Sequence, residues 1–122
     1  MGVWSPGAGP TAGADTFTGD GSNESASGDA GDDTLNGGGG DDHLTGGDGN
    51  DTLRGGDGDD TLLDLNGTSA LYGDAGNDTI DVLATLGGGG TNAFTLDGGD
   101  GDDVIAFGSG ATSADTVVIF GG

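Results

Sequence analysis

A single large apolar residue recurs every nine residues along much of the chain, with small or polar residues on both sides of it. Between residues 28 and 63 it is Leu35, Leu44, Leu53 and Leu62, in the consecutive units GDAGDDTLN, GGGGDDHLT, GGDGNDTLR and GGDGDDTLL. The units follow the pattern GGxGxDxUx, where U is the large apolar residue, except that Asp29 stands at the second position of the first unit. A fixed repeat of this kind is typical of a solenoid, in which each repeat contacts its neighbours.

The same register extends outward from these four units. PTAGADTFT (10–18) and GDAGNDTID (73–81) keep the glycine, aspartate and apolar positions. Units 19–27 and 64–72 are degraded, because Glu24 and Ser69 replace the sixth-position aspartate. Any metal site that depends on these two units is expected to be weaker.

After residue 81 the phase breaks, and it resumes as GGGGTNAFT (87–95), with Asn92 in the acidic position. Two residues are then skipped before GGDGDDVIA (98–106). We divide the chain into an N-terminal tail or cap (1–9), a repeat region (10–106) with an insertion near 82–86, and a C-terminal capping segment (107–122). The last segment is expected to contribute a closing strand at 117–120.

Each unit predicts a turn followed by a short strand. Glycine stands at the early positions, where a turn needs positive φ, and the last three residues are extended. Alternation along the strand turns position 8 inward, and two strands back to back close a coil of 18 residues. The predicted fold is all-β, a parallel solenoid of two short-strand sheets. The predicted core is Phe17, Leu35, Leu44, Leu53, Leu62, Leu71, Ile80, Phe94 and Ile105.

The strong negative charge of the chain must be considered beside its apolar core. The chain has 22 acidic residues and one arginine, a formal net charge of −21, and it has 32 glycines and only 30% apolar residues. Such a chain repels nucleic acid and anionic membrane surfaces, and no stretch approaches the ~20 apolar residues that span a bilayer. A thin core with so much negative charge is not expected to fold unaided.

The sixth-position aspartates suggest what holds the coils together. Asp33 and Asp51 lie one coil apart on one side, and Asp42, Asp60 and Asp78 on the other, so their carboxylates form two columns along the turns. The chain has no cysteine, which leaves oxygen ligands. A cation that takes six to eight oxygens is calcium, because magnesium demands stricter octahedral geometry.

The tandem units resemble the RTX (hemolysin-type) calcium-binding nonapeptide repeats of bacterial secreted toxins, proteases and lipases over residues 10–106. The resemblance implies a parallel β-roll with calcium in its turns. In that family each ion takes the main-chain carbonyls of positions 2 and 4 and the aspartate of the earlier turn. It also takes the carbonyls of positions 1 and 3 and the aspartate of the later turn.

Carried over to this sequence, the resemblance implies about four to six calcium ions. On one side the slots would join Thr11, Gly13 and Asp15 to Gly28, Ala30 and Asp33, and Asp29, Gly31 and Asp33 to Gly46, Asp48 and Asp51. On the other side they would join Gly38, Gly40 and Asp42 to Gly55, Asp57 and Asp60, and Gly56, Gly58 and Asp60 to Gly73, Ala75 and Asp78. A fifth slot would join Asp74, Gly76 and Asp78 to Gly98, Asp100 and Asp103.

The resemblance also implies a function. It indicates a module that folds on binding calcium outside the cell and serves as a secretion, folding and stabilising domain of a secreted bacterial protein, compatible with a larger parent polypeptide. The segment MGVWSPGAGP lacks the basic start and apolar run of a signal peptide, which favours a one-step (type I) exporter. The carboxylates are equivalent and His43 stands alone, so we expect no enzyme activity.

Two alternatives stay open. A calcium-rigidified roll would also suit a surface interaction module, either adhesive or ice-binding. Threonines such as Thr34 and Thr52 form short columns, but the turns lack the threonine of related antifreeze repeats. The other alternative is the non-catalytic tail of a secreted protease, lipase or epimerase.

Overall fold

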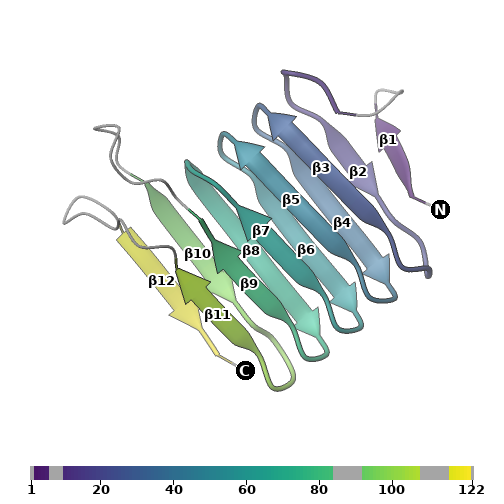
Figure 1. Cartoon of the computed structure of the whole chain (residues 1–122), viewed down its shortest axis with the longest axis vertical. Helices are drawn as coiled ribbons and strands as arrows, with labels where there is room; N and C mark the ends of the chain where they lie inside the picture. The colour runs from purple at the N-terminus through teal and green to yellow at the C-terminus, as the bar shows by residue number, and fades with distance from the viewer. Residues whose placement is uncertain (1, 6–9, 84–91, 108–115, 122) are drawn as a thin grey trace.

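The structure, a computed structural model that describes residues 2–5, 10–83, 92–107 and 116–121, is built from β-strands in two sheets (Figure 1). One sheet has the order β1-β2-β4-β6-β8-β10-β12, and the other has the order β11-β9-β7-β5-β3. The strands are β1 (Val3–Ser5), β2 (Thr16–Thr18), β3 (Ser25–Ala30), β4 (Thr34–Gly39), β5 (His43–Asp48), β6 (Thr52–Asp57), β7 (Thr61–Asp64), β8 (Thr68–Ala75), β9 (Thr79–Val82), β10 (Ala93–Asp97), β11 (Val104–Phe107) and β12 (Thr116–Phe120).

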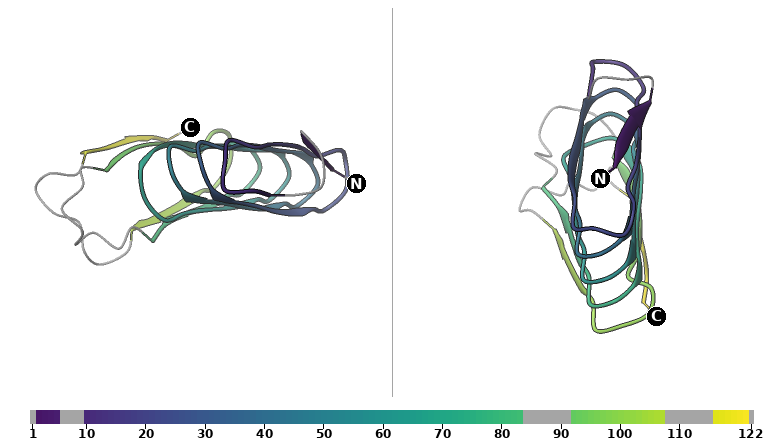
Figure 2. Two further views of the ribbon diagram at one scale, coloured as in Figure 1. Left: turned by 90° about the horizontal axis from the view of Figure 1, so that it is seen from above. Right: turned by 90° about the vertical axis from the view of Figure 1, so that its right-hand side faces the viewer.

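Consecutive strands from β2 to β11 alternate between the two sheets, so the chain winds in flattened coils (Figure 2). The pairing between β4 and β6 places Leu35 opposite Leu53, and that between β5 and β7 places Leu44 opposite Leu62. Partners in both pairs are parallel and 18 residues apart. The predicted 18-residue coil is confirmed.

The core is one row of apolar side chains between the sheets. Leu35, Leu44, Leu53, Leu62, Leu71 and Ile80 are fully buried, Phe17 and Phe94 are nearly so, and Ile105 packs partly buried against them. All nine predicted core residues therefore line the core. Ala26, Val82 and Leu96 are also buried, and the sequence pattern alone did not mark them.

The strands are longer than the three residues that each unit predicts. β3 to β6 have six residues each, because they continue through the first three positions of the following unit. Glycine allows this, since Gly38 and Gly56 are register partners, and a Cβ on Gly56 would meet the carbonyl oxygen of Gly38. Successive coils thus stack backbone to backbone at these positions.

The predicted register of unit 87–95 is wrong. β10 pairs with β8 so that Leu96 lies opposite Leu71, and Phe94 lies opposite Ser69. Leu96 therefore takes the eighth position and Phe94 the sixth, while Asn92 accepts a hydrogen bond from the Gly67 N–H through Oδ1 at 2.9 Å. The four successive glycines at 87–90 can be aligned with the repeat in more than one way, so the sequence alone does not determine the register of this unit.

The first residue of the insertion predicted near 82–86 lies in a strand. Val82, the first residue of the segment 82–86, belongs to β9 and is 1% exposed. Residues 84–86 lie outside the described residues.

Extra strands lie at both ends of the first sheet. β1 pairs antiparallel with β2, with Trp4 opposite Phe17. β12 pairs parallel with β10, with Val117 opposite Phe94, so the expected closing strand at 117–120 is present. Its side chains remain partly exposed. The described residues include no helix capable of crossing a membrane.

Candidate metal centre

The sixth-position aspartates form two buried columns at the turns between the sheets. Asp15, Asp33 and Asp51 stand in one column and Asp42, Asp60 and Asp78 in the other, and each is at most 3% exposed. Each lies directly before a strand that is fixed in register with the strand one coil away. The columns therefore follow from the repeat length and the parallel pairing.

A ladder of hydrogen bonds holds Oδ1 of Asp33, Asp42, Asp51, Asp60 and Asp78. The N–H of Asp42 donates to Oδ1 of Asp60 at 2.7 Å, and the N–H of Asp60 donates to Oδ1 of Asp78 at 2.8 Å. In the other column Oδ1 of Asp33 accepts from Asp15 at 2.7 Å, and Oδ1 of Asp51 accepts from Asp33 at 2.9 Å. Each of these contacts brings together two aspartates that the sequence assigns to one slot.

The second carboxylate oxygen is left without a partner. Oδ2 of Asp33, Asp42, Asp51, Asp60 and Asp78 is buried and makes no hydrogen bond. Buried polar atoms are rarely unpaired, and a buried charge without a counter-charge costs several kcal/mol. A row of such oxygens offers oxygen ligands that could coordinate cations.

Main-chain carbonyls surround the same space. A Cβ placed on Gly37 would touch Oδ2 of Asp42 and lie 2.7 Å from the carbonyl oxygen of Gly55 in the next coil. A Cβ on Gly55 would likewise touch Oδ2 of Asp60 and lie 2.8 Å from the Gly73 carbonyl oxygen. Within the described residues no three carboxylate or imidazole side chains converge. An ion here would depend on aspartates and carbonyls together, an all-oxygen set that fits calcium.

The comparison with known families agrees with this geometry. The RTX calcium-binding nonapeptide repeat matches in four copies, at residues 11–35, 27–62, 54–84 and 95–114. The chain belongs to the RTX calcium-binding repeat family. It is thus a calcium-binding β-roll module. It has no significant match among curated proteins or among solved structures.

Burial raises the pKa values of several of the aspartate carboxylates in the two columns when calcium is absent. Desolvation raises the pKa of Asp60 to about 6 and that of Asp51 to about 7, and neighbouring carboxylates add to the shift. The pKa values of Asp33, Asp42 and Asp78 are raised for the same leading reason. The N–H donated to each Oδ1 lowers the pKa of each of these groups, but desolvation outweighs it.

The raised pKa values predict a pH dependence for the calcium-free chain. Since these aspartates bind protons more tightly when folded, the free energy of unfolding should increase as the pH falls from about 7 toward the ordinary Asp pKa of 3.8. It should level off below that value. Circular dichroism in calcium-free buffer should show strand content rising over this range. Constant or falling strand content would contradict the prediction.

The outermost RTX slot differs from the interior ones. Both the N–H and the Oγ1 of Thr11 donate to Oδ2 of Asp15, at 2.5 Å and 2.9 Å. Asp15 therefore has a protein partner where the interior aspartates have none.

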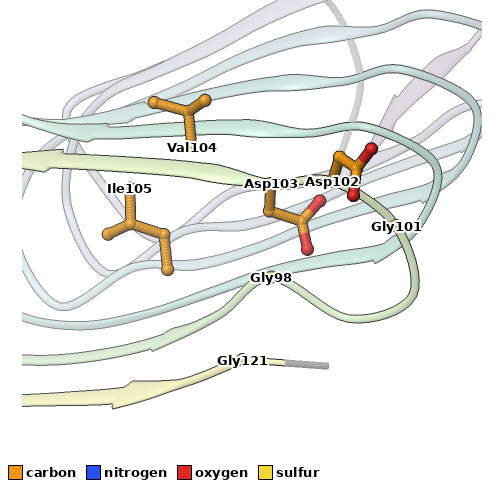
Figure 3. A pocket seen from close by; sticks show the side chains of 7 residues that line it. All are labelled: Gly98, Gly101, Asp102, Asp103, Val104, Ile105 and Gly121. Atoms are coloured by element: carbon orange, nitrogen blue, oxygen red, sulfur yellow. The ribbon is translucent and has the colours of Figure 1, made fainter.

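The opposite end of the second column is less enclosed. Asp103 accepts the Asp78 N–H through Oδ1 at 2.9 Å, across 25 residues instead of 18. Asp103 lies beside edge strand β11 and lines an open hollow of about 560 Å³ with Gly98, Gly101 and Gly121 (Figure 3). The predicted pairing of Asp78 with Asp103 is thus present in space.

The other predicted site residues belong to the turns and strand ends around the columns. Asp29 and Asp74, at the second position, have φ of 73° and 76°, a conformation usual for glycine. Asp48, Asp57 and Asp100, at the third position, have exposed side chains, so their carbonyls are the groups available to a slot. Glu24 accepts hydrogen bonds from the Asp20 N–H within its own turn at 3.2 Å.

Sequence reasoning missed one buried carboxylate, Asp64. It is the last residue of β7, it is fully buried, and its Oδ2 has no hydrogen-bond partner. The sequence did contain an indication of this site, because unit 64–72 has an acid at its first position and lacks the acid at its sixth.

Proposed function

We propose that calcium drives the folding of this module outside the cell, and that the module serves as a secretion, folding and stabilising domain of a secreted bacterial protein. The supporting observation is the row of buried aspartate Oδ2 atoms without partners. Without cations, closing the roll at neutral pH would bury several like charges side by side. Because the slots exist only when the coils are stacked, the free energy of calcium binding becomes free energy of folding.

The proposed ligands are those of the five slots given above, and the proposed content is about four to six ions. Asp33, Asp60 and Asp78 would each serve two slots. The interior slots have the strongest support, since their aspartates combine burial with an unpartnered oxygen. We assign no catalytic role to these carboxylates.

Substitution of Asp60 tests the shared-ligand arrangement. Asp60→Asn removes the charge between two slots and should lower the number of bound calcium ions by two. The calcium concentration at half-folding should rise at least about tenfold, equivalent to about 1.4 kcal/mol. Asp81→Asn is the matched control, since Asp81 lies between buried Ile80 and Val82 on the outer face of β9. Equal ion counts in the two variants would argue against this ligand set.

Export follows from the difference in calcium between compartments. Where calcium is scarce, the charge of −21 keeps the chain open, which suits passage through a one-step exporter. Extracellular calcium modules bind with dissociation constants of about 10⁻⁴ to 10⁻³ M, so folding would follow release. A larger parent polypeptide is compatible with this role.

A calcium titration followed by circular dichroism tests the proposal. Strand signal should appear cooperatively at about 10⁻⁴ to 10⁻³ M calcium, whereas magnesium at the same concentrations should leave the chain open. A chain already folded at submicromolar calcium would contradict folding after export, because it would fold before leaving the cell.

The structure does not favour an ice-binding role. The threonine column on the first sheet runs through Thr16, Thr34 and Thr52 and is then interrupted by Ala70. Three rungs make a small regular surface, and the β-propensity of threonine accounts for them.

A further inference from the structure

One slot lacks the aspartate that the repeat requires. Between turns 46–54 and 64–72 the later turn carries Ser69 at the sixth position. The Oγ of Ser69 accepts the Asp51 N–H at 3.0 Å, so it takes the place of an aspartate Oδ1 in the ladder. It brings no negative charge, however, and Oδ2 of Asp51 remains buried without a partner.

Asp64 brings a carboxylate into the same slot from another position. It stands at the first position of its unit, where Gly28, Gly46 and Gly55 stand in theirs. Its Oδ1 accepts the Gly47 N–H from the preceding coil at 3.3 Å. Its side chain is fully buried, and its Oδ2 has no hydrogen-bond partner.

The carboxylates of Asp51 and Asp64 converge beside Gly46. A Cβ built on Gly46 would lie 2.5 Å from Oδ2 of Asp51 and 2.7 Å from Oδ1 of Asp64. The only Lys or Arg residue of the chain, Arg54, does not neutralise this pair, because it forms an exposed ion pair with Asp74 at 2.7 Å. Two buried like charges facing one space call for a cation between them.

We propose that Asp64 supplies the carboxylate that Ser69 lacks, so that the slot between turns 46–54 and 64–72 binds calcium through Asp51 and Asp64. This inference rests on the proposed function and deepens it. It makes unit 64–72 a rearranged calcium turn, with its acid moved from the sixth position to the first. The first column of carboxylates then continues through Asp15, Asp33, Asp51 and Asp64.

Calcium counting by native mass spectrometry at saturating calcium tests this site. Asp64→Asn should bind one ion fewer than the unsubstituted chain, and Asp81→Asn should bind the same number. An unchanged count in Asp64→Asn would overturn the inference and would indicate that Asp51 and Asp64 only share a proton. It would leave calcium-driven folding intact, whereas an unsubstituted chain that binds no calcium would contradict the proposed function itself.

A charge-neutral double variant provides the rescue. Asp64→Gly combined with Ser69→Asp returns the unit to the repeat pattern and keeps the total charge, and it should recover the full ion count. If Asp64→Asn fails to fold in calcium, the double variant decides. A count equal to that of the unsubstituted chain supports the site, whereas a count one higher would show that the unsubstituted chain binds no ion in this slot and would overturn the inference.

Discussion

In excess EDTA at neutral pH the β-roll should lose most of its strand content, and added calcium should restore it. Far-UV circular dichroism and the dispersion of amide proton signals in NMR spectra measure this change. EDTA already saturated with calcium is the matched control and should have no effect. Retention of the strand signal and of dispersed amides in EDTA would contradict a calcium-dependent fold.

The expected loss is large because little else opposes the repulsion between the carboxylates. The interior slots bury pairs of aspartates whose second oxygen has no protein partner, and an uncompensated buried charge costs several kcal/mol. The apolar core is a single row of mostly leucine side chains. Native domains retain only about 5–15 kcal/mol of net stability, so a few unneutralised slots would exceed it.

Replacing Gly56 with alanine should be strongly destabilising although it leaves every aspartate in place. Gly56 has φ of 113°, and its added Cβ would meet the carbonyl oxygen of Gly38 in the neighbouring coil. That oxygen belongs to the main chain and cannot rotate away. The backbone conformation alone costs on the order of 1–3 kcal/mol, and the coils must also separate at the turn.

Gly21→Ala is the control for this substitution. A Cβ on Gly21 would meet nothing within 4 Å, and Gly21 is not among the positive-φ glycines. Urea unfolding in saturating calcium should show a loss of at least about 2 kcal/mol for Gly56→Ala and a change within about 0.5 kcal/mol for Gly21→Ala. Equal stabilities would show that close coil stacking at Gly56 is unimportant.

The sequence predicts most of the fold because a nine-residue period leaves few alternatives. With the apolar residue fixed at position 8, alternation places Leu35 and Leu53 inward, and parallel stacking then brings Asp33 beside Asp51. The paired aspartates of all five predicted slots lie one coil apart in the structure. Local pattern and long-range pairing agree in these coils.

The sequence-based predictions fail at two places where the nine-residue period does not determine the structure. The glycine run at 87–90 is compatible with several phases, and pairing with β8 selects the one that places Leu96 at the eighth position and Phe94 at the sixth. Asp64 was overlooked for a different reason. Its burial depends on its place beside Asp51 of the preceding coil, which the exchange of acids within unit 64–72 indicates only indirectly.

A crystal structure of the calcium-saturated protein, with ions located by anomalous scattering, tests the central claim most directly. We predict calcium between Asp33 and Asp51, between Asp42 and Asp60, and between Asp60 and Asp78, each contacting the carboxylate oxygens that now lack partners. An ordered roll with only water in these slots would contradict the account.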